Sequence, residues 1–167
     1  MEKIEKGAKK LVLLFFRMIK KQPTEKTVQN LIQFIKFGIV GASNTVISYL
    51  INIFILYILR PYNIPWDYVL GNVAAFILSV LWSFFWNNKY VFTKAEGEKR
   101  SVWLALLKTY IAYSFTGILL TNALSWIWID KLGISKFVAP LLNLIISIPL
   151  NFIINKLWAF KTYKSEE

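Results

Sequence analysis

Between Lys36 and Arg60 the chain reads FGIVGASNTVISYLINIFILYIL, a run of 23 residues without a charged side chain. An α-helix rises about 1.5 Å per residue, so about 20 apolar residues cross the roughly 30 Å hydrocarbon core of a bilayer. Three further charge-free runs of 19 to 21 residues follow, over residues 68–88, 109–129 and 137–155. Because lipid cannot hydrogen-bond exposed backbone groups, each run is predicted to be a membrane-spanning helix. The predicted fold class is all-α, a polytopic membrane protein with four transmembrane helices.

The composition of the 167-residue chain supports this class and excludes several others. Hydrophobic residues make up 56% of the chain and charged residues 17%, against about 45–50% and about 25% in soluble domains. The sequence contains no cysteine and no histidine, so it lacks the thiolate nucleophile, the commonest general base and the commonest metal ligands. We therefore predict no catalytic residue, no metal site and no cofactor, and do not expect an enzyme.

Basic residues are distributed unevenly around the four runs. Of the 20 Lys and Arg residues, 17 lie before the first run, between the second and third, or after the fourth. The other two connections hold only Arg60, Lys131 and Lys136. Because cytoplasmic loops carry an excess of Lys and Arg, both termini are predicted to face the cytoplasm. Topology and anionic lipid headgroups then explain the net charge of +11, and no nucleic-acid partner is expected.

The residues before the first span are predicted to form a separate arm. Leu11–Phe16 is apolar but far too short to cross a bilayer, and basic residues flank it on both sides. Such a segment predicts an amphipathic helix lying in the cytoplasmic interface of the membrane, with a linker that begins at Pro23 and Thr24. The predicted organisation is an arm at residues 1–32, a four-helix transmembrane domain at 33–161 and a cytoplasmic tail at 162–167.

The two halves of the chain resemble each other. Residues 83–92 (SFFWNNKYVF) align with residues 151–160 (NFIINKLWAF) at an offset of 68, which pairs Asn87 with Asn155. The first and third spans match more loosely, at positions 37, 41 and 45 against 113, 117 and 121. Each half contains two spans, so both halves enter the membrane in the same direction. The four helices are therefore predicted to form two parallel two-helix repeats.

Polar side chains in the spans lie on stripes, because they recur every three or four residues. The predicted ridges are Gly41, Thr45, Ser48 and Asn52; Asn72, Ser79, Ser83 and Asn87; Ser114, Gly117, Thr121 and Ser125; and Asn143, Ser147, Asn151 and Asn155. Small and hydroxyl side chains at such positions are typical of helix packing, whereas buried amides are costlier and favour a binding site. For Asn151 and Asn155 both interpretations stay open. Pro149 predicts a kink beside the last ridge, and with it a polar notch.

One lysine stands at the predicted cytoplasmic end of each span, namely Lys36, Lys89, Lys108 and Lys156. If the bundle brings them together, they form a basic collar at headgroup depth, and lysine binds phosphate as a point charge. The alternative is ordinary snorkelling and the positive-inside bias. Lys89 and Lys156 adjoin the repeated asparagines, which favours a phosphate role for these two. Trp86, Tyr90 and Trp158 are predicted at the same boundary, as aromatic support of a headgroup site or as membrane anchors.

The fourth span closes with Asn151-Phe152-x-x-Asn155-Lys156-x-Trp158-x-Phe160, a motif that resembles the GtrA-like family of small four-span membrane proteins. The family's first-span start is similar to residues 34–45 here, and residues 87–92 match as well. The resemblance covers roughly residues 33–161. It implies a place in the bacterial cytoplasmic membrane and a role in cell-surface polysaccharide or teichoic-acid glycosylation. It implies a translocase (flippase), or flippase subunit, for polyprenyl-phosphate-linked sugars such as undecaprenyl-phosphate hexose, working beside membrane glycosyltransferases.

On this hypothesis the lipid-linked phosphate is held by the lysines and the amides next to them. The candidate headgroup residues are Lys89, Lys156, Asn155, Asn87, Lys36 and Lys108, and those of the sugar or its polar path are Asn151, Asn143, Ser147, Asn44, Asn72 and Ser83. The alternative function is a non-transporting partner that recruits or stabilises a polyprenyl-phosphate glycosyltransferase. A small multidrug exporter ranks last, because the first span lacks a membrane-embedded glutamate. A bundle with few spans cannot easily enclose a polar path, so a homo-oligomer is one expected assembly.

Overall fold

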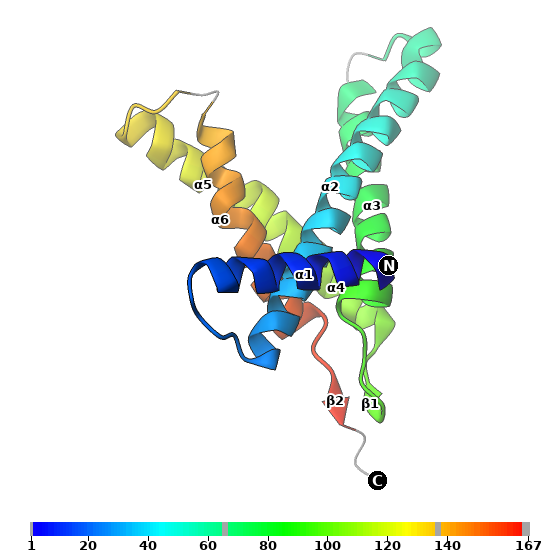
Figure 1. The fold of residues 1–167 in the computed structure, drawn as a ribbon. Coiled ribbons are helices and arrows are strands. Elements are labelled where there is room, and N and C mark those ends of the chain that lie inside the picture. The colour runs from blue at the N-terminus through cyan, green and yellow to red at the C-terminus, as the bar shows by residue number, and fades with distance from the viewer. Residues whose placement is uncertain (1, 65–66, 136–137, 165–167) are drawn as a thin grey trace. The chain divides into compact units, whose positions relative to one another are not determined.

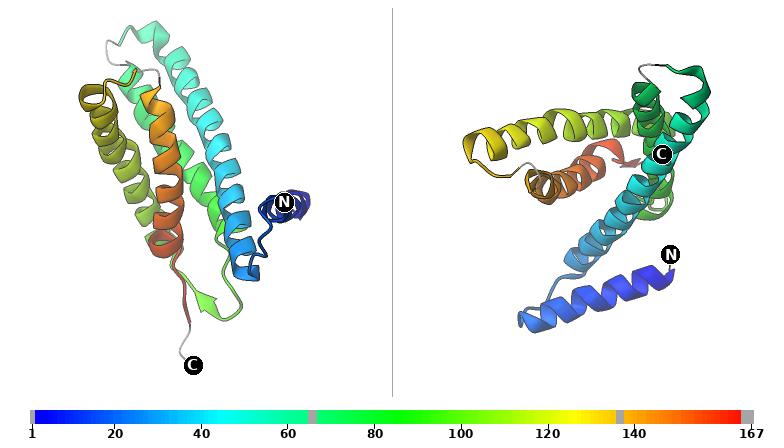
Figure 2. Two further views of the ribbon diagram at one scale, coloured as in Figure 1. Left: turned by 60° about the vertical axis from the view of Figure 1, so that its left-hand side comes forward. Right: turned by 90° about the horizontal axis from the view of Figure 1, so that it is seen from above.

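The computed structural model describes residues 2–64, 67–135 and 138–164. It divides into two compact units, Met1–Thr93 and Lys94–Glu167, and each unit contains a hairpin of two long helical segments (Figures 1 and 2). Four helices among the described residues are long and apolar enough to cross a membrane: Glu25–Tyr62, Leu70–Val91, Val102–Lys131 and Leu141–Ala159. The predicted all-α, four-span fold class is thereby confirmed. Lys136, Phe137 and residues 165–167 of the predicted tail lie outside the described residues.

The first unit consists of an N-terminal helix and the first hairpin. Its elements are α1 (Glu2–Met18), α2 (Glu25–Leu59), the 3₁₀ turn η1 (Arg60–Tyr62), α3 (Asp67–Trp86) and the π-helical turn η2 (Asn87–Val91). Thr24 caps α2, because its hydroxyl accepts a hydrogen bond from the backbone N–H of Thr27 at 3.2 Å. At the other end Asn63 adopts a left-handed conformation (φ 48°), which asparagine tolerates and which turns the chain toward α3.

α2 begins at Glu25 rather than at Phe37, because its first turns carry an apolar face that α1 covers. Ala8 and Val12 of α1 form a small buried cluster with Val28 and Ile32 of α2. Burying these side chains favours helix well before the membrane-spanning run starts. The helix therefore continues unbroken across residues 32 and 33, where the sequence places the start of the transmembrane domain.

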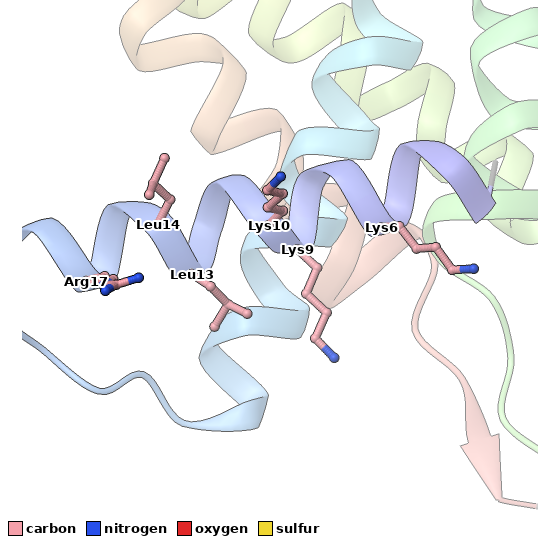
Figure 3. Close-up of a pocket in the computed structure, with 6 residues that line it drawn as sticks. All are labelled: Lys6, Lys9, Lys10, Leu13, Leu14 and Arg17. Atoms are coloured by element: carbon pink, nitrogen blue, oxygen red, sulfur yellow. The ribbon is translucent and has the colours of Figure 1, made fainter.

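α1 lies across α2 rather than along it (Figures 1 and 2). Its exposed large apolar side chains are Leu11, Leu13, Leu14, Phe15 and Met18. Basic side chains lie among them, and Figure 3 shows Lys6, Lys9, Lys10 and Arg17 beside Leu13 and Leu14 along one stretch of the helix, where they line a pocket. Apolar and basic side chains on one helix are typical of an interfacial membrane helix, and the position of α1 in the membrane stays a prediction.

The second unit is built from a shorter and less regular hairpin. Its elements are β1 (Glu98–Lys99), α4 (Val102–Ser114), the π-turn η3 (Phe115–Leu120), α5 (Thr121–Trp126), the π-turn η4 (Ile127–Lys131), α6 (Ala139–Ile154), the π-turn η5 (Asn155–Ala159) and β2 (Tyr163–Lys164). Ser101 caps α4 by accepting a hydrogen bond from the N–H of Leu104 at 3.3 Å. α6 continues through Pro149, and the polar notch predicted beside that residue stays a prediction.

A short antiparallel pair joins the two ends of the second unit. Glu98 of β1 lies opposite Lys164 of β2, and Lys99 lies opposite Tyr163. Arg100 donates a hydrogen bond to the carbonyl of Phe160 at 2.8 Å, and its guanidinium lies 4.9 Å from the centre of that ring. Burial lowers the pKa of Arg100, and the Glu98 carboxylate opposes the shift. The start of the predicted tail is thus held against the segment before α4.

Gly71 gives α3 a close approach to α2. A Cβ atom at this position would lie 3.0 Å from Nδ2 of Asn52. That nitrogen donates a hydrogen bond to Oδ1 of Asn72 at 2.9 Å. Small residues let membrane helices approach closely enough for such amide pairs to form. Asn72, a candidate for the sugar path, is therefore engaged in a contact between the two helices of its hairpin.

We expect Gly71→Ala to be less stable than Gly41→Ala by about 1 kcal/mol, because the new methyl group displaces Asn52 from Asn72. Gly41 is the matched control, since a Cβ there meets nothing within 4 Å and alanine gains helix propensity at both sites. Thermal unfolding of the two variants in the same detergent measures the difference. Equal midpoints would show that the amide pair contributes nothing to hairpin stability.

Candidate functional site

Both hairpins end in the same kind of turn. The turns η2 and η5 are both π-helical, and the first residue of each is an asparagine. The backbone carbonyl of that asparagine accepts a hydrogen bond from the backbone N–H five residues further along the chain. The distances are 2.8 Å from the Phe92 N–H to the Asn87 carbonyl, and 2.8 Å from the Phe160 N–H to the Asn155 carbonyl. π-turns are rare and occur often at functional sites. The two segments that align at an offset of 68 residues thus share one backbone geometry.

The asparagine side chains of the two turns are held alike as well. Asn87 and Asn155 are each fully buried, with no exposed area. Each side-chain amide nitrogen donates one turn back, Asn87 to the hydroxyl of Ser83 at 3.1 Å and Asn155 to the carbonyl of Asn151 at 2.8 Å. Each Oδ1 is buried and has no hydrogen-bond partner among the described residues. An unmatched buried acceptor costs about 1–3 kcal/mol, so both turns present an amide oxygen that needs a donor.

A lysine follows each of these asparagines and lies over aromatic rings. The ammonium of Lys89 is 5.5 Å from the ring centre of Phe85 and 5.2 Å from that of Tyr90. Lys156 lies 5.5 Å from the ring centre of Phe152. Such contacts hold a cation near the turn and contribute about 0.5–1 kcal/mol at exposed sites. Each turn therefore combines a buried acceptor with a positioned positive charge.

The aromatic candidates lie at these turns too. Trp86 stacks on Tyr90 with ring centres 5.4 Å apart and planes 15° from parallel. In the second unit, Lys108 lies 5.5 Å from the ring centre of Trp158 and 3.5 Å from the carbonyl of the same residue. The predicted aromatic and basic candidates are therefore neighbours within each unit.

The four predicted collar lysines fall into two pairs. Lys36 and Lys89 line one pocket of the first unit, together with Glu5 of α1. Glu5 forms a salt bridge with Lys36 that the sequence does not indicate, because the two residues are 31 positions apart. Lys108 and Lys156 belong to the second unit. A single collar of all four stays a prediction.

Asn143, a candidate for the sugar path, is fully engaged inside the second unit. Its Nδ2 donates to the hydroxyl of Ser125 at 2.7 Å and to the carbonyl of Thr121 at 3.3 Å. Its Oδ1 accepts from the indole N–H of Trp128 at 3.1 Å. A buried amide with all these partners fixes one helix against another.

Asn151 is hydrogen-bonded by a residue of the third span that is not part of the ridge predicted there. Its Oδ1 accepts a hydrogen bond from the hydroxyl of Thr116 at 2.9 Å, and Thr116 is fully buried within η3. Thr116 follows Thr109 and Ala112 at spacings of three and four residues, and all three are buried. They form a helix face that the ridge through Ser114 and Gly117 does not include. The signal in the sequence was a second series of small residues at Thr109, Ala112 and Thr116.

The last three polar candidates occupy different surroundings. Asn44 of α2 has a buried Oδ1 without a partner among the described residues. Ser83 is fully buried at the second-span turn, and Ser147 is half-buried on α6. Asn44 therefore adds a third unmatched amide oxygen to those of Asn87 and Asn155.

Comparisons with known proteins agree on one class of membrane domain. A family model described as the GtrA/DPMS transmembrane domain matches residues 36–160. A cell wall teichoic acid glycosylation protein GtcA of Listeria monocytogenes is 30% identical, and the alignment covers 69% of this chain and 78% of that protein. A second protein of that name from the same species is 32% identical over 75% of this chain and 83% of its own length. A dolichol-phosphate mannosyltransferase of Pyrococcus furiosus is 30% identical over 73% of this chain but only 32% of its own length. No solved structure matches.

Replacing Asn87 or Asn155, whose side-chain oxygens are unpaired, should leave stability almost unchanged. Replacing Asn143, whose amide is fully hydrogen-bonded, should lower it. We expect Asn87→Leu and Asn155→Leu to unfold within about 1 kcal/mol of the wild type, because each change also removes a buried unpaired oxygen. Asn143→Leu should lose about 1–3 kcal/mol, because it leaves the Trp128 N–H and the Ser125 hydroxyl unpaired.

Chemical denaturation in one detergent, followed by circular dichroism, ranks the three variants. A loss at Asn87 or Asn155 as large as that at Asn143 would assign the two turns a packing role.

Proposed function

Because the chain belongs to the GtrA/DPMS transmembrane domain family, we propose that it carries polyprenyl-phosphate-linked sugars across the membrane, alone or as a translocase subunit. As a GtrA-like membrane protein it is linked to teichoic acid glycosylation, and the sugars would serve that modification or a related surface polysaccharide. The observation that carries the proposal is the asparagine–lysine turn at the end of each hairpin. Each turn contains a buried oxygen without a donor among the described residues and, one or two positions further along the chain, a lysine at the charged end of a membrane span.

The chemistry of these turns fits the headgroup of such a lipid. A sugar hydroxyl is a donor, which is what the unmatched Oδ1 atoms of Asn87 and Asn155 lack. A phosphodiester carries one negative charge, which Lys89 or Lys156 matches as a point charge. The prenyl tail stays in the bilayer beside exposed apolar side chains such as Phe85, Ile153 and Leu157. The four charge-free runs contain no ionisable Asp, Glu, Lys or Arg, so we propose that movement follows the gradient of the lipid-linked sugar.

The proposed setting is the bacterial cytoplasmic membrane, with both termini inside. The basic residues favour this orientation, since 17 of 20 belong to the termini and the connection between the second and third spans. α1 would lie in the inner headgroup layer, because it crosses α2 and carries basic side chains beside apolar ones (Figure 3). The asparagine–lysine turns would then face the side on which the lipid-linked sugar is made.

A second candidate function is that of a non-transporting partner of a glycosyltransferase. One observation favours it: the relative named dolichol-phosphate mannosyltransferase matches this chain over only 32% of its length. In that protein, a segment similar to this chain is part of a longer polypeptide whose name is that of an enzyme. A separate chain of this family would then recruit or stabilise a polyprenyl-phosphate glycosyltransferase instead of moving its product.

We expect purified wild-type protein in liposomes to move undecaprenyl-phosphate glucose between the leaflets. The Asn155→Ala/Lys156→Ala variant should lower that rate by about tenfold or more, since removing one charge-assisted contact and one amide contact each costs about 1–2 kcal/mol. Radiolabelled lipid and a membrane-impermeant oxidant of the sugar measure the fraction exposed over time. Lys131→Ala is the matched control, because Lys131 also lies over a ring, 4.8 Å from the centre of Trp126, but far along the chain from either turn.

Two outcomes would revise the proposal. Equal rates for the Asn155/Lys156 variant and the Lys131 control would remove the second turn from the site. Movement that occurs only when a glycosyltransferase is added to the same liposomes would favour the partner function.

A further inference from the structure

A polar pocket of about 380 Å³ lies within the first unit, between α1, the first turns of α2 and the turn η2. Its volume falls within the roughly 300–1,000 Å³ of small-molecule sites. The polar and charged side chains that line it come from all three elements and include Glu5, Gln29, Gln33, Lys36, Lys89 and Thr93. Two lysines, one glutamate, two amides and two hydroxyl-bearing side chains (Tyr90 and Thr93) therefore line one space next to the charged ends of two spans.

Lys36 is the most confined charge at this pocket. Its side chain retains 12% of its exposure, and its ammonium lies 2.6 Å from Oε2 of Glu5. Because the Lys36 side chain is mostly covered, an anion next to its ammonium is screened less by water than it would be at a fully exposed lysine. Glu5 is 54% exposed, so its carboxylate can return to water at low cost. The salt bridge thus joins a mostly covered lysine to a half-exposed glutamate.

The attachment of Glu5 is also weak. Glu5 belongs to α1, whose buried contact with α2 is the small cluster around Ala8, Val12, Val28 and Ile32. The linker after α1 contains Lys20 in a left-handed conformation (φ 53°), so its backbone departs from helix there. Because Glu5 is half-exposed, a change of its side-chain rotamer can release Lys36 without a movement of α1.

We propose that this pocket receives the phosphodiester of a lipid-linked sugar at the cytoplasmic boundary, and that Glu5 is the resident counter-ion that the phosphodiester displaces. The inference rests on the proposed function and deepens it, because it names the entry site. Lys36 exchanges one singly charged anion for another, and the two non-bridging oxygens of the phosphodiester allow Lys36 and Lys89, which both line the pocket, to bind it together. Gln29, Gln33 and Thr93 offer donors and acceptors for sugar hydroxyls. A neutral lipid cannot replace the Glu5 carboxylate beside Lys36, so the pocket favours anionic lipids over neutral ones.

The test is the affinity of the full chain in mild detergent for geranyl-phosphoryl-glucose, measured by isothermal titration calorimetry. Glu5→Gln should bind about three- to tenfold more tightly than the wild type, because the competitor is gone. Glu25→Gln is the matched control. It removes the same charge from the same unit, but Glu25 is not among the residues that line this pocket, and binding should not change.

The lysines should respond in the opposite direction. Lys36→Gln and Lys89→Gln should each weaken binding by about tenfold, since a hydrogen bond to a charged group is worth about 1.5–3 kcal/mol. Lys36→Arg and Lys89→Arg keep the charge and should stay close to the wild type, which separates loss of a contact from loss of the fold.

Several results would overturn the inference. Equal affinities for Glu5→Gln and Glu25→Gln would show that Glu5 does not compete, and unchanged binding in both glutamine variants of the lysines would move the phosphate elsewhere. Inorganic phosphate that binds as tightly as geranyl-phosphoryl-glucose would make the pocket a site for free phosphate. If these results accompany sugar-lipid movement in wild-type liposomes, the entry site is wrong and the proposed function stands. If the wild type neither binds nor moves the lipid, both fail.

Discussion

Lipid offers no hydrogen-bond partner to a backbone N–H, a carbonyl or a polar side chain, and every other feature of this molecule follows from that constraint. It requires helices where the chain is charge-free, and it makes each polar atom in those helices a cost unless a partner is supplied. Asn143 meets this cost with three hydrogen bonds, and Asn52 and Asn72 meet part of it with each other. Asn87 and Asn155 leave one oxygen each unmatched. The first three amides therefore hold the hairpins together, whereas the side-chain oxygens of Asn87 and Asn155 have no donor among the described residues.

The two unmatched amides occupy the same place in two aligned segments. Both open a π-turn, both donate one turn back, and both precede a lysine over an aromatic ring. In each turn the asparagine carbonyl accepts a hydrogen bond from the N–H five residues on, while the side-chain oxygen is buried without a partner among the described residues. The duplication of the two halves stays a prediction, and the likeness of these turns favours it. The turns differ in their acceptors, Ser83 in one and a backbone carbonyl in the other.

The lysines at the predicted membrane boundary also make specific contacts. Lysines at the ends of the spans lie over aromatic rings, which attract a cation. Lys36 is different, because it is nearly buried and paired with Glu5 of the N-terminal helix. That helix precedes the matched family region at residues 36–160. A residue of the N-terminal helix thus forms an ion pair with the first residue of the matched family region.

By itself the sequence determined the four spans, the helical class, the family and the asparagine–lysine motif, because apolar runs, charge and short spacings are local properties of the chain. It also placed Lys89 beside Asn87 and Lys156 beside Asn155. The tertiary structure alone decided which polar atoms are satisfied: Thr116 reaches Asn151, Trp128 and Ser125 reach Asn143, and Glu5 reaches Lys36. These facts depend on contacts between residues distant in sequence, which a pattern of residue types does not specify.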